Sequence, residues 1–394
     1  MKETEQYLQE FSDKKIGVKP IFFNLKIAQE KESLRKLFDS STIIRVADDY
    51  QEELLELFGI NHPTEVYQPG FKESFEKYYA DLQKETPLSD HGVWVYFPWN
   101  GVLSHILEEK DFQIVRTARN RNLIDQREQE KFHDATVGIA GLSVGSSVAF
   151  ALTLQGGPKH IKLADMDRLA LTNTNRVLMG VDHLGSLKVE MAAHKIYEIN
   201  PYAEIELFPE GLNTENISLF CENLDLVIDE IDNLAIKYLL RTEAKKRKIA
   251  VVMGADNGDN AVVDVERYDL DPDLPFFHGR LGETSYDELS KLDKFGIGKT
   301  ITKHIGAENV TIRTQESLLE MGKTIVSWPQ LGGAALINGA AVAYCVRKIL
   351  NGQSVEGNRA LISLDEKLIP EYTSDEEIKK RNNASTAFKK IFGL

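Results

Sequence analysis

The sequence predicts an α/β protein: a mostly parallel sheet with helices on both faces and antiparallel additions, preceded by a small N-terminal α/β module. Short apolar runs alternate regularly with helical stretches from Thr136 onwards, which is typical of parallel β-α-β units. A glycine turn, Gly141-Leu-Ser-Val-Gly145, joins the first apolar run to the first helical stretch. The pattern before residue 131 is different, so we expect a module of unknown role over residues 1–130 and an α/β domain over residues 131–394.

The N-terminal module alternates charged helical stretches with one strand-like run, residues 92–97. Trp94 and Tyr96 alternate there with two valines, and Pro98 ends the run. We expect a small α/β or mostly helical fold. The sequence of this module indicates no chemistry.

The α/β domain contains five predicted parallel strands and a sixth that follows a Gly-Asp-Asn turn. This turn is too short for a crossover helix, so the sixth strand is expected to be antiparallel. The predicted strands are residues 136–141, 160–164, 204–208, 224–228, 249–253 and 261–268. The predicted helices are residues 146–155, 188–199, 235–248 and 332–350. This order of elements is typical of a Rossmann-like sheet.

The last predicted helix, residues 332–350, is rich in alanine and glycine. Small residues permit close backbone approach, so we expect it to pack tightly against the sheet or against another subunit. Asn338, Arg347 and Lys348 interrupt its apolar sequence, which argues against a membrane span.

Composition disfavours several classes of protein. The chain has 394 residues, of which 42% are hydrophobic, enough to bury a large core. Its formal net charge of −14 disfavours nucleic acid as a main partner, because an acidic surface repels phosphate backbones. The two cysteines, Cys221 and Cys345, form no Cys-x-x-Cys pair, so neither a disulfide framework nor a four-cysteine zinc site is expected. The N-terminal sequence MKETEQYLQEF has no apolar segment and the chain has no run of about eighteen apolar residues, so we expect a cytoplasmic protein.

The glycine turn is the first candidate binding element. Backbone N–H groups and the positive end of the helix dipole favour an anion at such a turn. Gly141 and Gly145 are present, but Ser143 stands where a full G-x-G-x-x-G would have its second glycine. By itself this element is therefore compatible with a phosphate site and with a simple tight turn.

Two acids follow the second predicted strand. Asp165 lies at its end, where a Rossmann-like fold places an acid against ribose hydroxyls. Asp167 is expected to point the other way along an extended chain, and either it caps the following turn or it contributes to a site.

Cationic and amide side chains come next. Asn173 and Arg176 are three residues apart, which places them on one side of a helical turn. Arginine offers a planar fork of donors that matches phosphate oxygens. Lys188 begins the next predicted helix, where its charge opposes the dipole, so an anion should compensate it unless it is a plain surface lysine.

An acidic cluster follows the fourth predicted strand: Asp229, Glu230 and Asp232, with Asn233 next. Ligands of open α/β sheets bind outside the carboxyl ends of the strands, and an acid there can hold Mg²⁺ beside phosphate oxygens. Alternatively, Asp229 or Asp232 only caps the helix that begins near Leu234.

Together these motifs resemble the adenylyltransferase superfamily that includes ThiF, MoeB and the ubiquitin-activating enzymes. The resemblance runs from about Arg119 to Asp264 and continues near the C-terminal helix. It rests on Arg119-Asn-Arg121, the glycine turn, Asp165-Met-Asp167, Asn173-Thr-Asn-Arg176, Gly185-Ser-Leu-Lys188, Asp232-Asn233 and Trp328-Pro-Gln-Leu-Gly332.

The resemblance implies ATP and Mg²⁺ as cofactors and a role for each matching residue. Asp165 would bind the ATP ribose, and the glycine turn and Asp167 would belong to the same nucleotide site. Asn173, Arg176 and Lys188 would bind the triphosphate and stabilise charge as pyrophosphate leaves. Asp232 would hold Mg²⁺.

The resemblance also implies partners. Arg121 matches an arginine that family members reach across a dimer interface towards the partner's ATP, so a homodimer is expected. The attacking group would be a carboxylate, commonly the C-terminal glycine of a small ubiquitin-like or sulfur-carrier protein, or the carboxylate of a peptide or small acid. The product would be an acyl-adenylate.

The chain departs from the family in three respects. Its glycine turn is poorer than the usual form, and the Cys-x-x-Cys zinc pairs common in the MoeB branch are missing. No cysteine lies between Asp264 and Trp328, where members that form a thioester or persulfide often keep one. Cys221 and Cys345 look like core residues. We therefore predict adenylation without a catalytic cysteine, by a divergent member.

Three other functions are compatible with this fold. One is a dehydratase that activates threonylcarbamoyladenosine on tRNA. Another is an NAD-dependent oxidoreductase, which would use Asp165 but leaves Arg176, Lys188 and Asp232 unexplained. The third is a non-catalytic nucleotide-binding partner subunit, although such subunits usually lose one of these three residues.

The acceptor is not specified by any motif. Selectivity for it is expected to lie in the N-terminal module and in residues 275–321, where His278, Arg280 and Lys299 are available for contacts.

Overall fold

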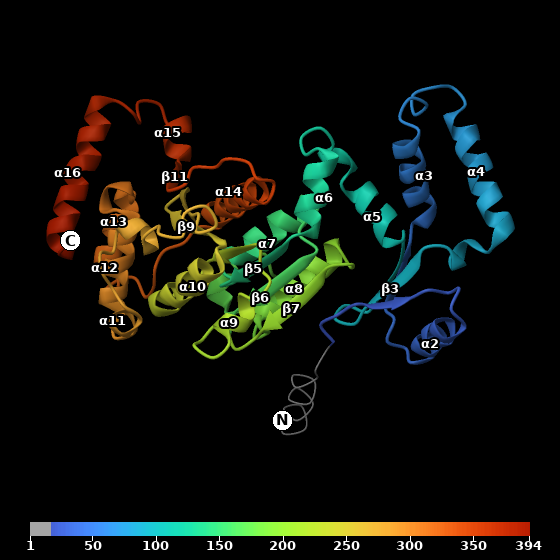
Figure 1. The fold of residues 1–394 in the computed structure, drawn as a ribbon, viewed down its shortest axis with the longest axis horizontal. Helices are drawn as coiled ribbons and strands as arrows, with labels where there is room; N and C mark the ends of the chain where they lie inside the picture. The colour runs from blue at the N-terminus through green and yellow to red at the C-terminus, as the bar shows by residue number, and fades with distance from the viewer. Residues whose placement is uncertain (1–16) are drawn as a thin grey trace, which may run out of the picture. The chain divides into compact units, whose positions relative to one another are not determined.

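The computed structural model describes residues 17–394, which form two compact units (Figure 1). Unit 1 comprises Met1–Gln126 and Tyr197–Tyr202, and unit 2 comprises Arg127–Ile196 and Ala203–Leu394. The expectation drawn from the N-terminal sequence MKETEQYLQEF falls on residues 1–16, outside the described residues.

Unit 1 is built on a four-stranded sheet in the order β1-β3-β4-β2. β3 and β4 form an antiparallel hairpin, β1 pairs antiparallel with β3, and β2 pairs parallel with β4. The strands are β1 (Ile21–Phe23), β2 (Arg45–Asp48), β3 (Val93–Phe97) and β4 (Val102–Ile106). The helices are α2 (Ala28–Asp39), α3 (Tyr50–Asn61), α4 (Phe71–Glu85) and α5 (Glu109–Arg116). Unit 1 is therefore α/β, and the mostly helical alternative is wrong.

Strand β3 has the predicted alternation. Trp94 and Tyr96 pack on one face with residues of β1 and α2, whereas Val95 and Phe97 pack on the other with Ile106. Because both faces are covered, the strand is apolar at every position from Val95 to Phe97.

Glu53 on α3 gives unit 1 a pH-dependent stability. Burial raises the pKa of Glu53 to about 7, although its carboxylate accepts a hydrogen bond from Leu107 N at 2.8 Å. The folded chain then holds a proton that the unfolded chain releases at a lower pH, so this contribution is full below the ordinary glutamate pKa and is lost as the pH rises through about 7. We expect Glu53→Gln to remove this loss.

The measurement is urea unfolding of the full chain in a Trp328→Phe background, so that fluorescence reports on Trp94 and Trp99 in unit 1. The same pH dependence in Glu53→Gln would show that another group is responsible.

Unit 2 is built on a seven-stranded sheet in the order β11-β10-β9-β8-β5-β6-β7. The five strands from β9 to β7 are parallel, and β10 pairs antiparallel with both β9 and β11. The strands are β5 (Thr136–Ala140), β6 (His160–Ala164), β7 (Glu204–Phe208), β8 (Leu226–Asp229), β9 (Ala250–Asn257), β10 (Asn260–Glu266) and β11 (Arg359–Ile362). The predicted mostly parallel sheet with an antiparallel addition is confirmed.

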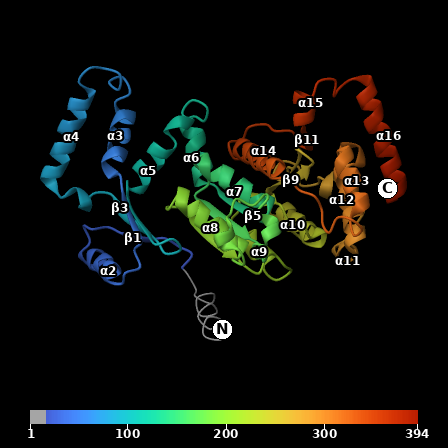
Figure 2. The same cartoon turned by 180° about the vertical axis from the view of Figure 1, so that it is seen from behind.

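Helices cover both faces of this sheet. β5-α7-β6 and β8-α10-β9 step in opposite directions from the centre of the sheet, so their right-handed crossovers place α7 and α10 on opposite faces. α14 packs beside α7, and α9 packs beside α10 (Figure 1, Figure 2). The helices are α6 (Gln126–Asp134), α7 (Val144–Leu154), α8 (Lys188–Ile199), α9 (Ile217–Phe220), α10 (Leu234–Arg247) and α14 (Gly332–Leu350).

Helix α14 confirms the expected close packing against the sheet. A Cβ atom added at Gly339 would lie 2.8 Å from atoms of Ser147 on α7, so only glycine allows the two helices to approach so closely. Within residues 17–394, α14 is the one helix long and apolar enough to cross a membrane. Its packing against α7, β9 and β10 explains that apolar sequence as core packing.

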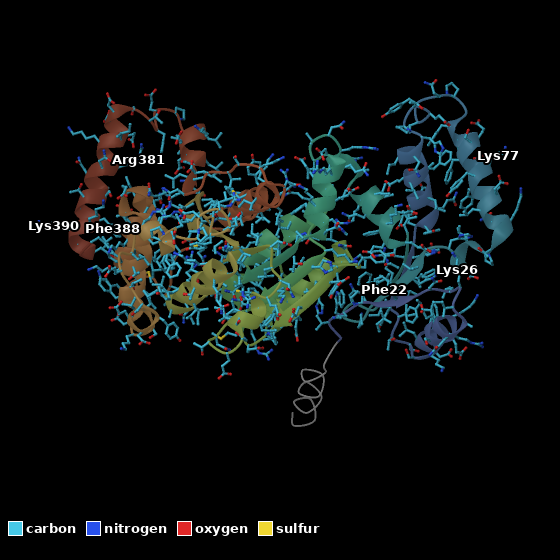
Figure 3. All side chains as sticks on the ribbon, in the orientation of Figure 1. Phe22, Lys26, Lys77, Arg381, Phe388 and Lys390 are labelled. Carbon is cyan, nitrogen blue, oxygen red and sulfur yellow. The ribbon has the colours of Figure 1, made fainter. Side chains whose placement is uncertain are left out.

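The C-terminal part of unit 2 adds a helical layer. The helices are α11 (Tyr286–Ser290), α12 (Lys294–Ile305), α13 (Ile312–Glu320), α15 (Leu364–Leu368) and α16 (Asp375–Phe392). Phe388 and Phe392 of α16 pack with Leu318 of α13, and Figure 3 labels Phe388 on this helix. This layer extends the region that the sequence assigned to acceptor selectivity.

Candidate functional site

The candidate site lies between β5 and β8, where the order of the strands reverses: β6 and β7 follow on one side of β5, and β8 and β9 lie on the other. The carboxyl ends of these adjacent parallel strands carry the glycine turn and the acidic cluster. Gly141 has φ +86°, and a Cβ atom there would lie 2.2 Å from the Glu230 carbonyl oxygen. The two turns therefore touch, at the position where open α/β sheets bind ligands.

Gly141→Ala is expected to destabilise unit 2 more than Gly185→Ala. Both glycines have positive φ, which costs an alanine about 1–2 kcal/mol. Only at Gly141 does the new methyl group also collide with backbone, which adds about 1–3 kcal/mol, since a Cβ at Gly185 meets nothing within 4 Å. Urea unfolding measures the difference, and equal losses in the two variants would contradict it.

Asp165 ties the glycine turn to the end of β6. Its carboxylate accepts hydrogen bonds from Leu142 N at 2.7 Å and from Asp167 N at 2.8 Å. Burial raises the pKa of Asp165, while the charge of Lys188 and these hydrogen bonds oppose that rise. β6 ends at Ala164, and Asp167 follows just outside the strand, where its N–H donates to the Asp165 carboxylate.

Lys188 is compensated by Asp167. Lys188 Nζ donates to Asp167 Oδ2 at 2.8 Å, and its side chain is only 6% exposed. The alternative of a plain surface lysine is wrong. The anion required at this helix start is supplied by the chain itself.

Arg176 lies against the glycine turn. Its Nε donates to Ser143 Oγ at 2.9 Å, and its Nη1 donates to Thr172 O at 3.2 Å and to Asn175 Oδ1 at 3.0 Å. Within residues 17–394 its Nη2 has no hydrogen-bond partner, so one edge of the guanidinium remains available to a ligand. Asn173 stabilises the same turn by accepting from Ala170 N at 3.0 Å.

Helix α10 is capped by Asn233 and not by Asp229 or Asp232, which were the two capping residues considered from the sequence. Asn233 caps α10, because its Oδ1 accepts from Ala235 N at 3.0 Å and from Ile236 N at 3.2 Å. Asp232 is exposed and has no partner within the described residues. An unpaired carboxylate at the carboxyl end of β8 fits a Mg²⁺ ion that takes its other ligands from phosphates and water. Within residues 17–394 no group of three acidic, histidine or cysteine side chains could hold a metal without such ligands.

The other two acids of the cluster point into unit 2. Asp229 is fully buried and pairs with Lys237 at 3.1 Å and Arg241 at 2.5 Å. Burial alone would raise the pKa of Asp229, but the charges of Lys237 and Arg241 hold it below its ordinary value. Burial raises the pKa of Glu230 well above its ordinary value, and its Oε1 accepts a hydrogen bond from Gly254 N at 2.7 Å. Both acids therefore stabilise the sheet beneath the site.

Asp256 and its contacts in this region were not anticipated. Asp256, near the carboxyl end of β9, accepts from Asn338 Nδ2 at 2.6 Å and from Gln330 Nε2 at 3.3 Å. Two signals were present in the sequence: an acid shortly after the predicted end of a parallel strand, and a single asparagine within an apolar helix. Neither indicates which distant side chain would be its partner.

The remaining predicted residues have different surroundings. Arg121 belongs to unit 1 and is exposed, and its role at a dimer interface stays a prediction. Arg280 is partly exposed and pairs with the buried Asp264 at 3.3 Å, and its contact with the acceptor stays a prediction. His278 is half-buried in a strained loop with φ +53°, and Lys299 lies on α12.

Both cysteines are poorly suited to nucleophilic chemistry. Burial raises the pKa of Cys221 to about 12 and also raises that of Cys345. The thiolate is the nucleophilic form, so burial suppresses the reactivity of both.

Comparisons with known proteins match the part of the chain that carries this site. The model of the ThiF family matches residues 117–266, which include the glycine turn, Arg176, Lys188 and Asp232. An uncharacterized protein of Mycobacterium tuberculosis is 34% identical over 331 residues, covering 82% of this chain and 46% of that protein. The chain thus spans less than half the length of this relative.

Two relatives have named activities. The tRNA threonylcarbamoyladenosine dehydratase of Bacillus subtilis is 32% identical over 210 residues, covering 50% of this chain and 82% of that protein. The molybdopterin-synthase adenylyltransferase of Haemophilus influenzae is 28% identical over 170 residues, covering 43% and 65%. With the predicted motifs gathered at one edge of a mostly parallel sheet, these matches lead to one conclusion: the chain belongs to the ThiF family.

Proposed function

We propose that the chain is an ATP-dependent adenylyltransferase that transfers AMP to a carboxylate and releases pyrophosphate. The observation that carries this proposal is the position of Arg176 against the glycine turn. Its Nε donates a hydrogen bond to Ser143 Oγ, and its Nη2 has no hydrogen-bond partner within the described residues. A planar cation preorganised beside a strand-to-helix turn is suited to a triphosphate. Membership of the ThiF family and the similarity to an adenylyltransferase support the same reaction.

The reaction needs positioning and charge neutralisation more than covalent help from the protein. A carboxylate oxygen of the acceptor attacks the α-phosphorus of ATP and forms a new P–O bond. The bond between the α-phosphorus and the oxygen that bridges to the β-phosphate breaks, and pyrophosphate leaves with the electron pair. Arg176, Asn173 and Lys188 would hold the phosphates, and Arg176 would stabilise the charge that develops on pyrophosphate.

The acids at the end of β6 would form the nucleoside side of this site. Asp165 would accept from the ribose hydroxyls, and the Lys188–Asp167 pair would hold the turn after β6 in place. Gly141, Ser143 and Gly145 would allow the phosphates to approach the start of α7. The raised pKa values of Cys221 and Cys345 favour a mechanism without a catalytic cysteine.

Asp232 would hold the Mg²⁺ ion that neutralises the triphosphate. ATP binding measured by calorimetry should therefore be strengthened by Mg²⁺ in the unmodified protein, and Asp232→Ala should lose most of this metal effect. Asn233→Ser, which keeps an uncharged capping side chain next to Asp232, is the matched control for disturbance of the turn. ATP binding that is absent, or equal with and without Mg²⁺, would contradict the proposal.

The acceptor we favour is the C-terminal carboxylate of a ubiquitin-like or sulfur-carrier protein, or of a peptide, with the chain acting as a homodimer through Arg121. The Haemophilus influenzae relative is named as an adenylyltransferase of molybdopterin synthase, which supports a protein as the acceptor. Incubation with α-labelled ATP and a panel of carrier proteins, peptides and small acids would identify the acceptor as the one that becomes adenylated.

A dehydratase acting on threonylcarbamoyladenosine of tRNA is the second candidate. It is favoured by the similarity to the Bacillus subtilis dehydratase, of which the chain covers 82%. The net charge of −14 argues against it, since tRNA is a polyanion. Retention of labelled tRNA on filters at low salt would support the dehydratase, and lack of retention would exclude it.

A further inference from the structure

Asp256 is held on both sides by amide side chains. It lies on β9, two strands from the glycine turn, and its Oδ1 accepts from Asn338 Nδ2 at 2.6 Å. Its Oδ2 accepts from Gln330 Nε2 at 3.3 Å. Asn338 belongs to the middle of α14, and Gln330 precedes that helix, so Asp256 joins β9 to both. Asn338 is fully buried, which fixes this donor in place.

The segment that carries Gln330 packs against the turn that carries Arg176. Gln330 O accepts a hydrogen bond from Asn175 Nδ2 at 2.8 Å. A Cβ atom at Gly332 would lie 2.4 Å from Asn175 O, so the two backbones are in direct contact there. A shift of Gln330 would therefore be transmitted to Asn175.

Asn175 in turn orients the guanidinium. Its Oδ1 accepts from Arg176 Nη1 at 3.0 Å, while Ser143 Oγ accepts from Arg176 Nε at 2.9 Å. The guanidinium plane is thus fixed from two sides, by the glycine turn and by Asn175. Nη2, which has no partner within residues 17–394, is the group whose direction these contacts determine.

Asp256 can influence Arg176 without using any of the N–H donors of its guanidinium. No ion pair within the described residues joins the two side chains. Burial raises the pKa of Asp256, and the hydrogen bonds from Asn338 and Gln330, followed by the charge of Arg176, oppose that rise without cancelling it. A direct ion pair would compete with phosphate for the guanidinium. Acting through Gln330 and Asn175, the carboxylate can orient the cation and leave it open to a ligand.

We propose that Asp256 is a positioning residue for Arg176, and that Asn338, Gln330 and Asn175 relay its position so that Nη2 faces the triphosphate of ATP. This inference rests on the proposed function, because it assigns Arg176 to the phosphates. It adds a residue on β9, outside the predicted nucleotide motifs, to the machinery that binds ATP.

The test compares the affinities of the full chain for ATP and for adenosine, measured by calorimetry in the presence of Mg²⁺. Asp256→Asn keeps the shape of the side chain but replaces one carboxylate oxygen by an NH₂ group. That group cannot accept the hydrogen bond that Asn338 or Gln330 donates. We expect it to weaken ATP binding about tenfold, the effect of one weakened hydrogen bond to a charged group, and to leave adenosine binding unchanged. Asp259→Asn, an exposed acid in the turn between β9 and β10, is the matched control and should change neither affinity.

The same pair of variants is then measured in an Arg176→Ala background. If Asp256 acts through Arg176, Asp256→Asn should have no further effect there. Equal weakening of ATP and adenosine would mean a merely structural role, and an undiminished effect in the Arg176→Ala background would mean an independent contact. Either result, or an Asp256→Asn variant with unchanged ATP affinity, overturns this inference alone. Failure of the unmodified protein to bind ATP overturns the proposed function and this inference with it.

Discussion

Arg176→Ala is expected to lower ATP–pyrophosphate exchange about 100-fold or more. The guanidinium is held in place by Ser143 and Asn175 before any ligand arrives, so alanine removes a preorganised cation. Loss of a single preorganised donor at a site of developing charge costs about 10²–10³ in rate. Incorporation of labelled pyrophosphate into ATP, with the acceptor identified by adenylation, measures the loss.

Arg168→Ala is the matched control for this prediction. Arg168 lies on the same connection between β6 and α8, but its Nη1 donates to Gly185 O at 2.7 Å and it takes no part in the proposed site. Its exchange rate should stay near that of the unmodified protein. If the two arginine variants exchange equally fast, Arg176 does not stabilise the departing pyrophosphate.

Asp229→Ala is expected to cost about 3–5 kcal/mol of unfolding free energy. The variant leaves Lys237 and Arg241 buried without this carboxylate. Among residues 17–394, Arg241 then keeps only Glu266, at 2.6 Å, as an acidic partner. Breaking one side of a buried ion pair is costly because the remaining charge stays out of water. Urea unfolding of the full chain in a background with Trp94→Phe and Trp99→Phe, so that fluorescence reports on Trp328 in unit 2, measures the loss.

Lys246→Ala on the same helix separates this effect from a general weakening of α10. Lys246 is largely exposed and lies 3.6 Å from Glu243, so its removal should leave the unfolding free energy within experimental error. A stability of Asp229→Ala equal to that of Lys246→Ala would mean that the buried network of Asp229 does not stabilise unit 2.

Local patterns predicted most of the sheet because its strands are short, apolar and separated by polar turns. β6, β7, α8 and α14 begin and end where the sequence predicted. β9 continues to Asn257, beyond the predicted end at Met253, because it pairs with β10 in a hairpin whose register joins Asn257 to Asn260. The extension depends on a cross-strand partner, and apolar periodicity does not report it.

The acidic cluster shows the limit of such patterns. Asp229, Glu230 and Asp232 are chemically similar and nearly adjacent, so the sequence could not distinguish them. Burial separates them: Asp229 is enclosed with two cations, Glu230 lies beneath the glycine turn, and Asp232 is exposed. The direction of each side chain follows from where β8 ends and α10 begins, which a shift of one residue would change.

By itself, the sequence determined the succession of strands and helices, the parallel sheet and the residues gathered at its carboxyl edge, because these follow from local periodicity and from turns that order neighbouring segments. Only the tertiary structure decided that Asp167 compensates Lys188, and that Asp256 lies beside Gln330 and Asn338. The latter contacts join residues 74 and 82 positions apart. Local sequence does not encode such long-range contacts. They form because α14 packs its apolar face onto the sheet, which brings the polar groups of distant segments together.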